Sequence, residues 1–324
     1  MTVASVLERQ ASADLAPNPR RATARQIVGF VLRIVLSAAL FAAALWATSA
    51  TLDLRQLTVV GPKTLGLCLM LSALVVCLLA CRWRSVVAGF PEHPDRNYVP
   101  DVASFVRLTW IGLAVNQVLP SVVGGDALRA SLLAGQGVPA ARAVGSVVVD
   151  RLYGLVGLAL LCMAAMPLLG NDLFGSTLLA AAVTAVMVVV AAAAILICSR
   201  QFDRAKRLAV ALRQTTSLRR NLILIPTAIA GHLANVAIFL VMAHALGADL
   251  PILPATAVLL SVLLVSVLPL SIAGWGLREF TLVQAFGNIG VEHDKIVLSS
   301  VAYGLFLLVT QALGFFLIVG RKRP

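Results

Sequence analysis

The sequence predicts an all-α polytopic membrane protein built as an inverted repeat, in which each half holds three transmembrane helices and one re-entrant helical hairpin. Of its 324 residues, 60% are hydrophobic and 12% are charged, whereas a soluble protein carries about 25% charged residues. Several apolar runs exceed the roughly 18 residues that a membrane span requires. A motif that occurs twice predicts the repeat.

Hydropathy divides the chain into eight apolar segments. They cover about 27–50, 60–81, 101–118, 140–169, 175–199, 222–246, 255–273 and 296–320. Segments 101–118 and 255–273 are unusual, because each runs into a proline that glycines soon follow. Residues 1–25 are predicted to form a disordered basic tail, not a cleavable signal, since the first apolar run is long and no small-residue cleavage site follows it.

The basic residues fall mainly in loops on one side. Seventeen of the 26 lysines and arginines lie in 1–25, 82–100, 200–221 and 321–323, whereas loops of the other parity hold only Arg55, Lys63 and Lys295. The positive-inside rule therefore predicts both termini and the 200–221 loop in the cytoplasm. Attraction to anionic lipids of the inner leaflet accounts for the net charge of +12, and no nucleic-acid partner is expected.

The sidedness of the loops constrains the two unusual segments. Because 82–100 and 200–221 are both predicted to be cytoplasmic, 101–136 must enter the membrane and return to the same side, and 255–287 must do so from the outside. The alternative is that each hairpin crosses fully in two helices. The apolar stretches after the turns, 127–134 and 277–287, are too short for a full crossing at about 1.5 Å per residue.

The duplicated motif reads LPSVVGGDALRA at 119–130 and LPLSIAGWGLRE at 268–279, at an offset of 149 residues. It divides the membrane region into a first repeat, 26–170, and a second repeat, 171–324. An odd number of crossings in each half gives the two repeats opposite orientations. Inverted repeats with interrupted helices mark the substrate site in many transporters.

Each copy of the motif should break a helix and start another. A proline ends the incoming helix, and glycines permit a positive-φ turn and close backbone approach. The new helices are expected to begin near Asp126 and near Trp275 or Gly276. Their free N–H groups would suit a phosphate, and both turns are expected to line one internal cavity. The residues predicted to form the turns are Pro120, Gly124, Gly125, Pro269, Gly274 and Gly276.

Arg129 and Arg278 follow the two turns. An arginine at membrane depth costs about 2.5–3.5 kcal/mol on insertion scales and is read as functional by default. Two such residues facing a cavity would hold an anionic headgroup through bidentate contacts. The alternative is local pairing, of Arg129 with Asp126 and of Arg278 with Glu279, although adjacent helical residues do not face each other.

Asp150, Arg151 and Asn116 complete the candidate substrate-binding residues. Asp150 and Arg151 are adjacent within the apolar segment 140–169, and neighbours on a helix diverge by about 100°. We expect Asp150 to meet Arg129 or Arg278, and Arg151 to meet Asp126 or Glu279. Such pairs either break and re-form during transport or hold the helices together. Asn116 either satisfies backbone groups near Pro120 or touches substrate.

Other features narrow the function. The apolar residues of 200–221 recur at helical spacing between basic ones, which predicts an amphipathic helix on the inner leaflet or a partner-binding helix. The five cysteines and four histidines show no disulfide framework and no metal spacing. No nucleophile or nucleotide motif is present, so no cofactor or catalytic residue is expected.

Three stretches together resemble the transmembrane domain of lysylphosphatidylglycerol synthases, a domain that also occurs alone in flippase-like proteins of bacterial and archaeal inner membranes. They are NQVLPSVVGGDALRA, VVVDRLYGLVGL and VLPLSIAGWGLREF. The resemblance covers the chain beyond residue 25 and implies a lipid flippase of the bacterial inner membrane. The sequence ends at RKRP, and the synthase domain is expected to be missing. The resemblance therefore leaves the lipid open, with hopanoid, polyprenyl-linked and glycosylated lipids among those associated with stand-alone relatives.

Three hypotheses follow. The first is a transporter that moves a polar-headgroup lipid between leaflets, with Arg129 and Arg278 at the headgroup. The second is a membrane enzyme, or a subunit of one, that modifies lipids and uses Asp126, Asp150 or Glu279 as a base or to orient substrate. The third is a scaffold that recruits cytosolic lipid-modifying enzymes through 200–221.

Overall fold

Among the residues that the structure describes, four helices of the computed structural model are long and apolar enough to cross a membrane. They are α3 (Pro62–Val87), α6 (Ala140–Ala165), the Arg220–Ala245 part of α9 (Leu218–Ala245), and His293–Phe315, which joins α12 (His293–Ala312) to η3 (Leu313–Phe315). The chain is therefore a multi-pass membrane protein. The structure describes residues 35, 38–39, 42–43, 54–90, 98–118, 122–165, 167, 218–266, 275–287 and 292–319.

Shorter helices lie between the long ones. The first pair is α4 (Val102–Val118) and α5 (Val122–Ala134), and the second pair is α10 (Ile252–Ser266) and α11 (Leu277–Gly287). The 3-10 helix η1 (Leu54–Val59) precedes α3, and α13 (Phe316–Val319) follows η3. The order long, short, short, long thus occurs twice, and the described residues contain no strand.

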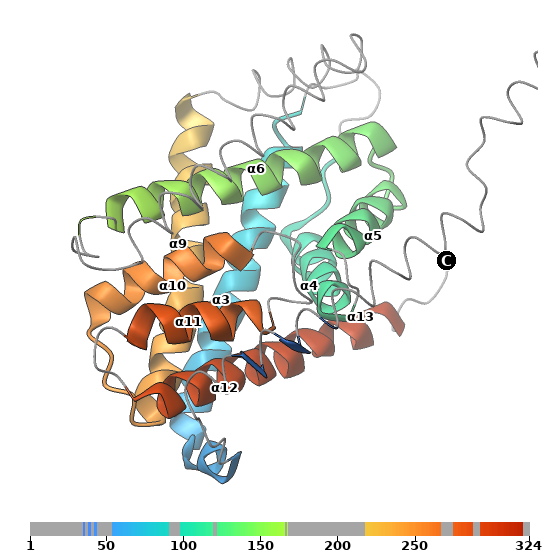
Figure 1. The fold of residues 1–324 in the computed structure, drawn as a ribbon. Coiled ribbons are helices and arrows are strands. Elements are labelled where there is room, and N and C mark those ends of the chain that lie inside the picture. Colours follow the sequence, from blue (N-terminus) through green and yellow to red (C-terminus); the bar gives the residue numbers. More distant parts are fainter. Residues whose placement is uncertain are drawn as a thin grey trace, which may run out of the picture.

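Helices α3 and α9 lie side by side (Figure 1) and run in opposite directions. At one end, Arg220 at the start of α9 donates a hydrogen bond of 3.0 Å to the carbonyl of Gly89, just beyond α3. Nearer the other end, the thiol of Cys68 on α3 lies 3.9 Å from the carbonyl of Ile238 on α9. The second long helix of each expected repeat thus packs against its counterpart.

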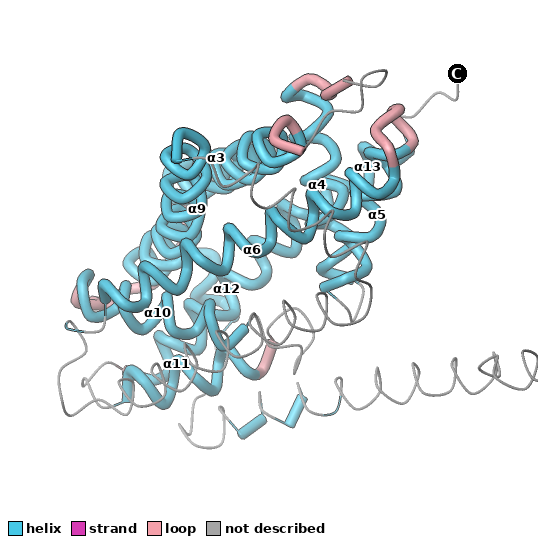
Figure 2. Tube along the Cα trace, turned by 90° about the horizontal axis from the view of Figure 1, so that it is seen from above, coloured by secondary structure: helices cyan, strands magenta, loops and turns pink. Residues whose placement is uncertain are grey.

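The remaining helices pack around this pair in a reciprocal way (Figure 2). Helix α6 contacts α5 from its own half and α10 from the other half, while α12 contacts α11 from its own half and α4 from the other. The contact between α4 and α12 is fastened by Trp110, whose Nε1 donates to the carbonyl of Thr310 at 3.0 Å, and by the side-chain pair Gln117 and Gln311, also at 3.0 Å.

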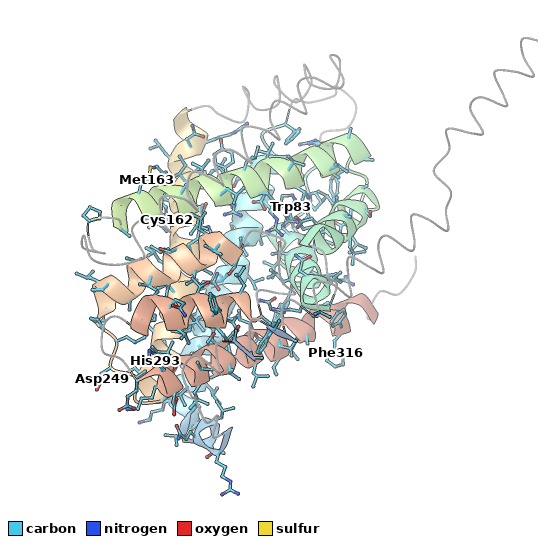
Figure 3. The ribbon with its side chains drawn as sticks, viewed as in Figure 1. Trp83, Cys162, Met163, Asp249, His293 and Phe316 are labelled. Atoms are coloured by element: carbon cyan, nitrogen blue, oxygen red, sulfur yellow. The ribbon has the colours of Figure 1, made fainter. Side chains whose placement is uncertain are left out.

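Apolar side chains both fill the interior and cover the outside. Figure 3 shows Trp83 among α3, α5 and α6, where it packs edge-on against Phe105 and is fully buried. Phe316 instead projects from the far end of the bundle and is 74% exposed. A surface with such residues suits contact with lipid tails.

Comparison with the predicted segments shows one informative error. The apolar segment 60–81 was expected to end before a cytoplasmic loop that begins at Arg82, but α3 continues to Val87. Arg82 lies inside the helix and is 5% exposed. The predicted tail 1–25, nearly all of segment 27–50, segment 175–199 and most of the 200–221 loop lie outside the described residues.

The short helices agree in length with the hairpin prediction. At about 1.5 Å per residue, the 13 residues of α5 and the 11 of α11 span about 20 and 17 Å. The hydrocarbon core of a bilayer is about 30 Å thick. The connections 119–121 and 267–274 lie outside the described residues.

Candidate functional site

A buried carboxylate lies where three helices of the first half meet. Oδ1 of Asp150, on α6, accepts a hydrogen bond of 2.8 Å from Nε of Arg82 on α3. Its Oδ2 accepts one of 3.2 Å from Nη2 of Arg129 on α5. Asp150 is 1% exposed, and each of the two arginines is 5% exposed. One carboxylate therefore joins α3, α5 and α6 inside the protein.

A second carboxylate extends this group towards the surface. Asp126 accepts two hydrogen bonds of 2.7 Å from Nε and Nη2 of Arg151. Nε of Arg129 lies 3.1 Å from Oδ1 of Asp126 but outside hydrogen-bond geometry. The Arg151 side chain is 44% exposed. We call these five residues the Asp150 cluster: Arg82, Asp126, Arg129, Asp150 and Arg151.

The Asp150 cluster has more positive than negative groups. Three guanidinium groups face two carboxylates, so one positive charge is in excess when all five are ionised. The guanidinium of Arg129 lies 4.7 Å from the centre of the Trp83 ring, an arrangement that stabilises a cation. Trp83 is itself held by a hydrogen bond of 3.0 Å from Nε1 to the hydroxyl of Ser146.

Two glycines and an asparagine set the position of α5. A Cβ at Gly125 would collide with the backbone carbonyl of Gly112 on α4, so the two helices approach as closely as their backbones allow. The amide oxygen of Asn116 accepts a hydrogen bond of 3.0 Å from the N–H of Gly125. That N–H lies in the first turn of α5. Asn116 therefore satisfies a backbone group at the start of α5.

This arrangement corrects one prediction. The helix was expected to begin near Asp126, with Gly124 and Gly125 in a positive-φ turn, but α5 begins at Val122 and both glycines lie within it. The role of Gly125 is close backbone approach, not turn formation. Asp126 is then one turn inside α5, where it reaches Arg151 instead of lying at the free N-terminus.

The second half contains a different buried group. Oε1 of Glu279 accepts hydrogen bonds from Arg278 Nη2 at 2.6 Å and from the Ser300 hydroxyl at 2.8 Å. Nε of Arg278 also donates to that hydroxyl, at 2.8 Å. The guanidinium lies 5.3 Å from the ring centres of both Trp275 and Tyr303. We call these five residues the Glu279 cluster: Trp275, Arg278, Glu279, Ser300 and Tyr303.

Glu279 also caps the start of α11. Its Oε2 accepts a hydrogen bond of 2.7 Å from the N–H of Gly276, the residue before the helix. This is the return half of a capping box. Gly276 has φ of +81°, which only glycine adopts without strain, so the predicted turn at Gly276 is found. Pro120, Pro269 and Gly274 lie outside the described residues.

The structure selects among the expected partners. Asp150 pairs with Arg129, Arg151 pairs with Asp126, and Arg278 pairs with its neighbour Glu279. The two adjacent side chains can pair because both bend towards Ser300 on α12. Among the described residues, no ion pair joins the two clusters.

Arg82 is the member of the Asp150 cluster that was missed. It follows directly after an apolar run, so hydropathy assigned it to a loop. The useful signal was helical continuity: no proline or glycine occurs between Arg82 and Ala88, and nothing else ended the helix at residue 81.

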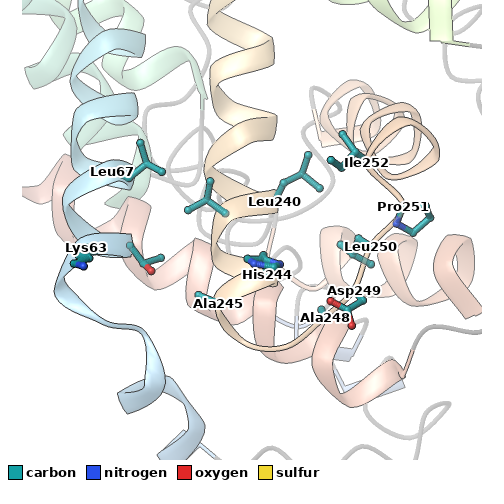
Figure 4. A pocket seen from close by; sticks show the side chains of 12 residues that line it. Lys63, Leu67, Leu240, His244, Ala245, Ala248, Asp249, Leu250, Pro251 and Ile252 are labelled. Carbon is teal, nitrogen blue, oxygen red and sulfur yellow. The ribbon is translucent and has the colours of Figure 1, made fainter.

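A cavity of about 810 Å³ lies away from both clusters, between α3 and α9 (Figure 4). Neither Arg129 nor Arg278 lines it. The cavity expected between the two turns depends on 119–121 and 267–274 and stays a prediction. Among the described residues, no group of histidine, cysteine, aspartate and glutamate side chains could hold a metal ion.

Comparisons with known proteins agree with the membrane architecture. The family model described as lysylphosphatidylglycerol synthase TM region matches residues 30–314, a range that includes every member of both clusters. A comparison with curated proteins finds no match.

Proposed function

Because the chain belongs to the lysylphosphatidylglycerol synthase TM region family, we propose that it moves a polar-headgroup lipid between the two leaflets of a bacterial inner membrane. The substrate is a membrane lipid whose headgroup carries an anionic phosphate or carboxylate. Both termini lie in the cytoplasm in this proposal, in keeping with the distribution of basic residues. The tails of the lipid stay in the bilayer while the headgroup passes through the protein.

The excess positive charge of the Asp150 cluster carries the proposal. A net charge inside an apolar bundle is costly, and an anionic headgroup would neutralise the excess. Arg151 is the accessible member, since its side chain is 44% exposed while those of Arg82 and Arg129 are 6% exposed. The headgroup would therefore meet Arg151 first.

Exchange of ion-pair partners supplies a mechanism. Asp126 is held by Arg151 and lies beside Arg129. A phosphate that binds Arg151 bidentately replaces Asp126 there, and Asp126 then remains with Arg129. In this scheme Asp150, which joins three helices, keeps the site assembled while the outer pair opens.

The arrangement of the halves supports alternating access. Each of α6 and α12 packs on its own hairpin and on the hairpin of the other half. Rocking of one half against the other would move both hairpins together. We propose that the halves are inverted, that the hairpins are re-entrant, and that Arg278 receives the headgroup on the opposite side after release from Glu279.

Leaflet exchange in proteoliposomes tests the proposal. The purified chain is reconstituted with fluorescent phosphatidylglycerol, and the fraction of probe reached by an impermeant quencher is followed with time. Arg151→Gln should slow exchange about tenfold, because it removes the bidentate contact while leaving Asp126 beside Arg129. Arg129→Ala with Arg278→Ala should abolish exchange.

Lys295→Ala is the matched control, since it removes an exposed cation that pairs only with exposed Glu292 among the described residues. It should leave the rate unchanged. Exchange in wild-type vesicles that equals the rate in empty vesicles would contradict transport. A lipid of altered mass would favour a lipid-modifying enzyme, and wild-type rates in every arginine variant would favour a scaffold.

A further inference from the structure

The cavity between α3 and α9 combines unpaired polar groups with an apolar wall. It is lined by the start of α3, the end of α9 and the connection to α10, and its volume is about 810 Å³. Small-molecule sites in proteins typically have volumes of about 300–1,000 Å³. Figure 4 shows Lys63 on α3, His244 on α9 and Asp249 on the connection around the same opening.

Three polar side chains of the cavity have no partner among the described residues. The side chains of Lys63, His244 and Asp249 form no hydrogen bond or ion pair with another described residue. Lys63 and Asp249 carry opposite charges and lie on separate elements that face each other across the opening. A ligand that bears an anion and a cation a few bonds apart would satisfy both groups at once.

The apolar part of the cavity continues onto the outer surface of the protein. Leu67 and Leu240 line the wall, each about one helical turn from Lys63 or His244. Leu67 is 40% exposed and Ile252, at the rim, is 71% exposed. In a membrane protein these side chains face lipid tails, so an acyl chain can lie along Leu67 and Ile252 while its headgroup occupies the cavity.

The position of the cavity indicates a leaflet. The opposite end of the α3 and α9 pair carries Arg82, Arg84 and Arg220. Basic residues gather on the cytoplasmic side of membrane proteins. The cavity therefore belongs to the outer leaflet.

We propose that this cavity binds a zwitterionic phospholipid of the outer leaflet, with its phosphate at Lys63 and its ammonium group at Asp249. The phosphate gains a charge-assisted hydrogen bond from Nζ of Lys63, and the carboxylate of Asp249 accepts one from the ammonium. His244 lies between the two in the view of Figure 4. This site is separate from both arginine clusters and does not depend on the transport proposal.

Native mass spectrometry of the full chain tests this site. The protein is taken from nanodiscs that contain equal amounts of phosphatidylethanolamine and phosphatidylglycerol, and the lipids that remain bound are counted by headgroup. The wild type should retain phosphatidylethanolamine over phosphatidylglycerol by about tenfold, the size expected of one extra charge-assisted hydrogen bond. Lys63→Ala with Asp249→Ala should remove this preference.

Two further variants separate the site from general effects. Glu292→Ala with Lys295→Ala removes an equivalent pair of exposed charges that do not line the cavity, and it should keep the preference. Ala245→Phe fills the cavity and leaves every charge in place, and it should lose the bound lipid. A wild type without preference, or a preference that survives both cavity variants, would overturn the proposal.

A soluble probe identifies the source of the headgroup. Free glycerophosphoethanolamine carries the same phosphodiester and ammonium charges without acyl chains, so it should not displace bound phosphatidylethanolamine at equal concentration. Displacement by the soluble compound would show that the cavity binds a free zwitterion, and it would overturn the assignment to a lipid.

Discussion

Asp150 and Arg82 are joined by a hydrogen bond of 2.8 Å between Oδ1 and Nε, with 2% and 6% of their side chains exposed. The two residues lie 68 positions apart on α6 and α3. A buried ion pair adds little net stability compared with apolar residues of the same volume, but the loss of one partner leaves an uncompensated buried charge. The pair is therefore sensitive to single substitutions.

Asp150→Asn should destabilise the protein by about 3–5 kcal/mol, because Arg82 and Arg129 then face each other without a carboxylate between them. The free energy of unfolding in detergent, measured against denaturant, checks this value. Glu292→Gln breaks an exposed ion pair and should cost about 0–1 kcal/mol. Equal effects of the two substitutions would contradict the central role of Asp150.

Arg82→Met combined with Asp150→Asn should be more stable than Asp150→Asn alone, by about 0.5–3 kcal/mol. Arg82→Met removes a cation that Asp150→Asn leaves without its carboxylate. The excess charge of the cluster therefore returns to its original value. The same unfolding assay, applied to the wild type, both single variants and the double variant, measures this coupling. Simple additivity would mean that the two residues do not interact.

Gly125→Ala should destabilise the protein by about 1–3 kcal/mol, the usual cost of overpacking. The new methyl group would meet the backbone carbonyl of Gly112, which cannot rotate away. Gly66→Ala is the matched control, since it also lies in a helix but has no atom within 4 Å of the added Cβ. It should stabilise α3 by about 0.5–1 kcal/mol. Thermal unfolding measures both effects: the unfolding temperature should fall in Gly125→Ala and rise in Gly66→Ala.

Much of the helical architecture could be predicted from the sequence. Hydropathy located the four long helices, and most of the paired Pro-Gly motif falls in or beside the connections 119–121 and 267–274, whose breaks stay a prediction. Local rules also predicted a turn at Gly276, since glycine adopts a positive φ without strain.

Tertiary partners were harder to predict. The sequence left Asp150 with a choice between Arg129 and Arg278, because periodicity gives the face of a helix but not the helix that it meets. Arg82 was missed since its cost of burial is offset by a residue 68 positions away. The start of α5 was misplaced because Asn116, on another helix, satisfies the N–H of Gly125.

Low pH should destabilise the first turn of α4. Hydrogen bonds from the side chain and backbone of Ser104 hold the pKa of Asp101 below its ordinary value of 3.8. The ionised carboxylate accepts the Ser104 N–H at 3.0 Å, three residues on, as an N-cap. Since this pKa is lower in the folded state, the stabilisation is present above the unfolded pKa and is lost as the pH falls through the folded value.

Hydrogen exchange of the first turn of α4, corrected for the intrinsic rate, should therefore accelerate as the pH falls below the ordinary value of 3.8. Asp101→Ala should exchange faster at every pH and show no such transition. Thr58, whose hydroxyl bonds locally to the carbonyl of Arg55, belongs to a segment without this carboxylate and serves as an internal reference. A transition that persists in Asp101→Ala would assign it to another group.

Opposite orientation of the two halves predicts that the loops after the two hairpins lie on opposite sides of the membrane. Gln136 follows the first hairpin, and exposed Glu292 follows the second. Single cysteines at these positions, in a variant without the five native cysteines, should react differently with an impermeant thiol reagent. Glu292→Cys should be labelled in intact cells, and Gln136→Cys only after the membrane is opened, because basic loops remain in the cytoplasm. Labelling of both from the same face would rule out an inverted repeat, and the shared rocking of the hairpins would lose its structural basis.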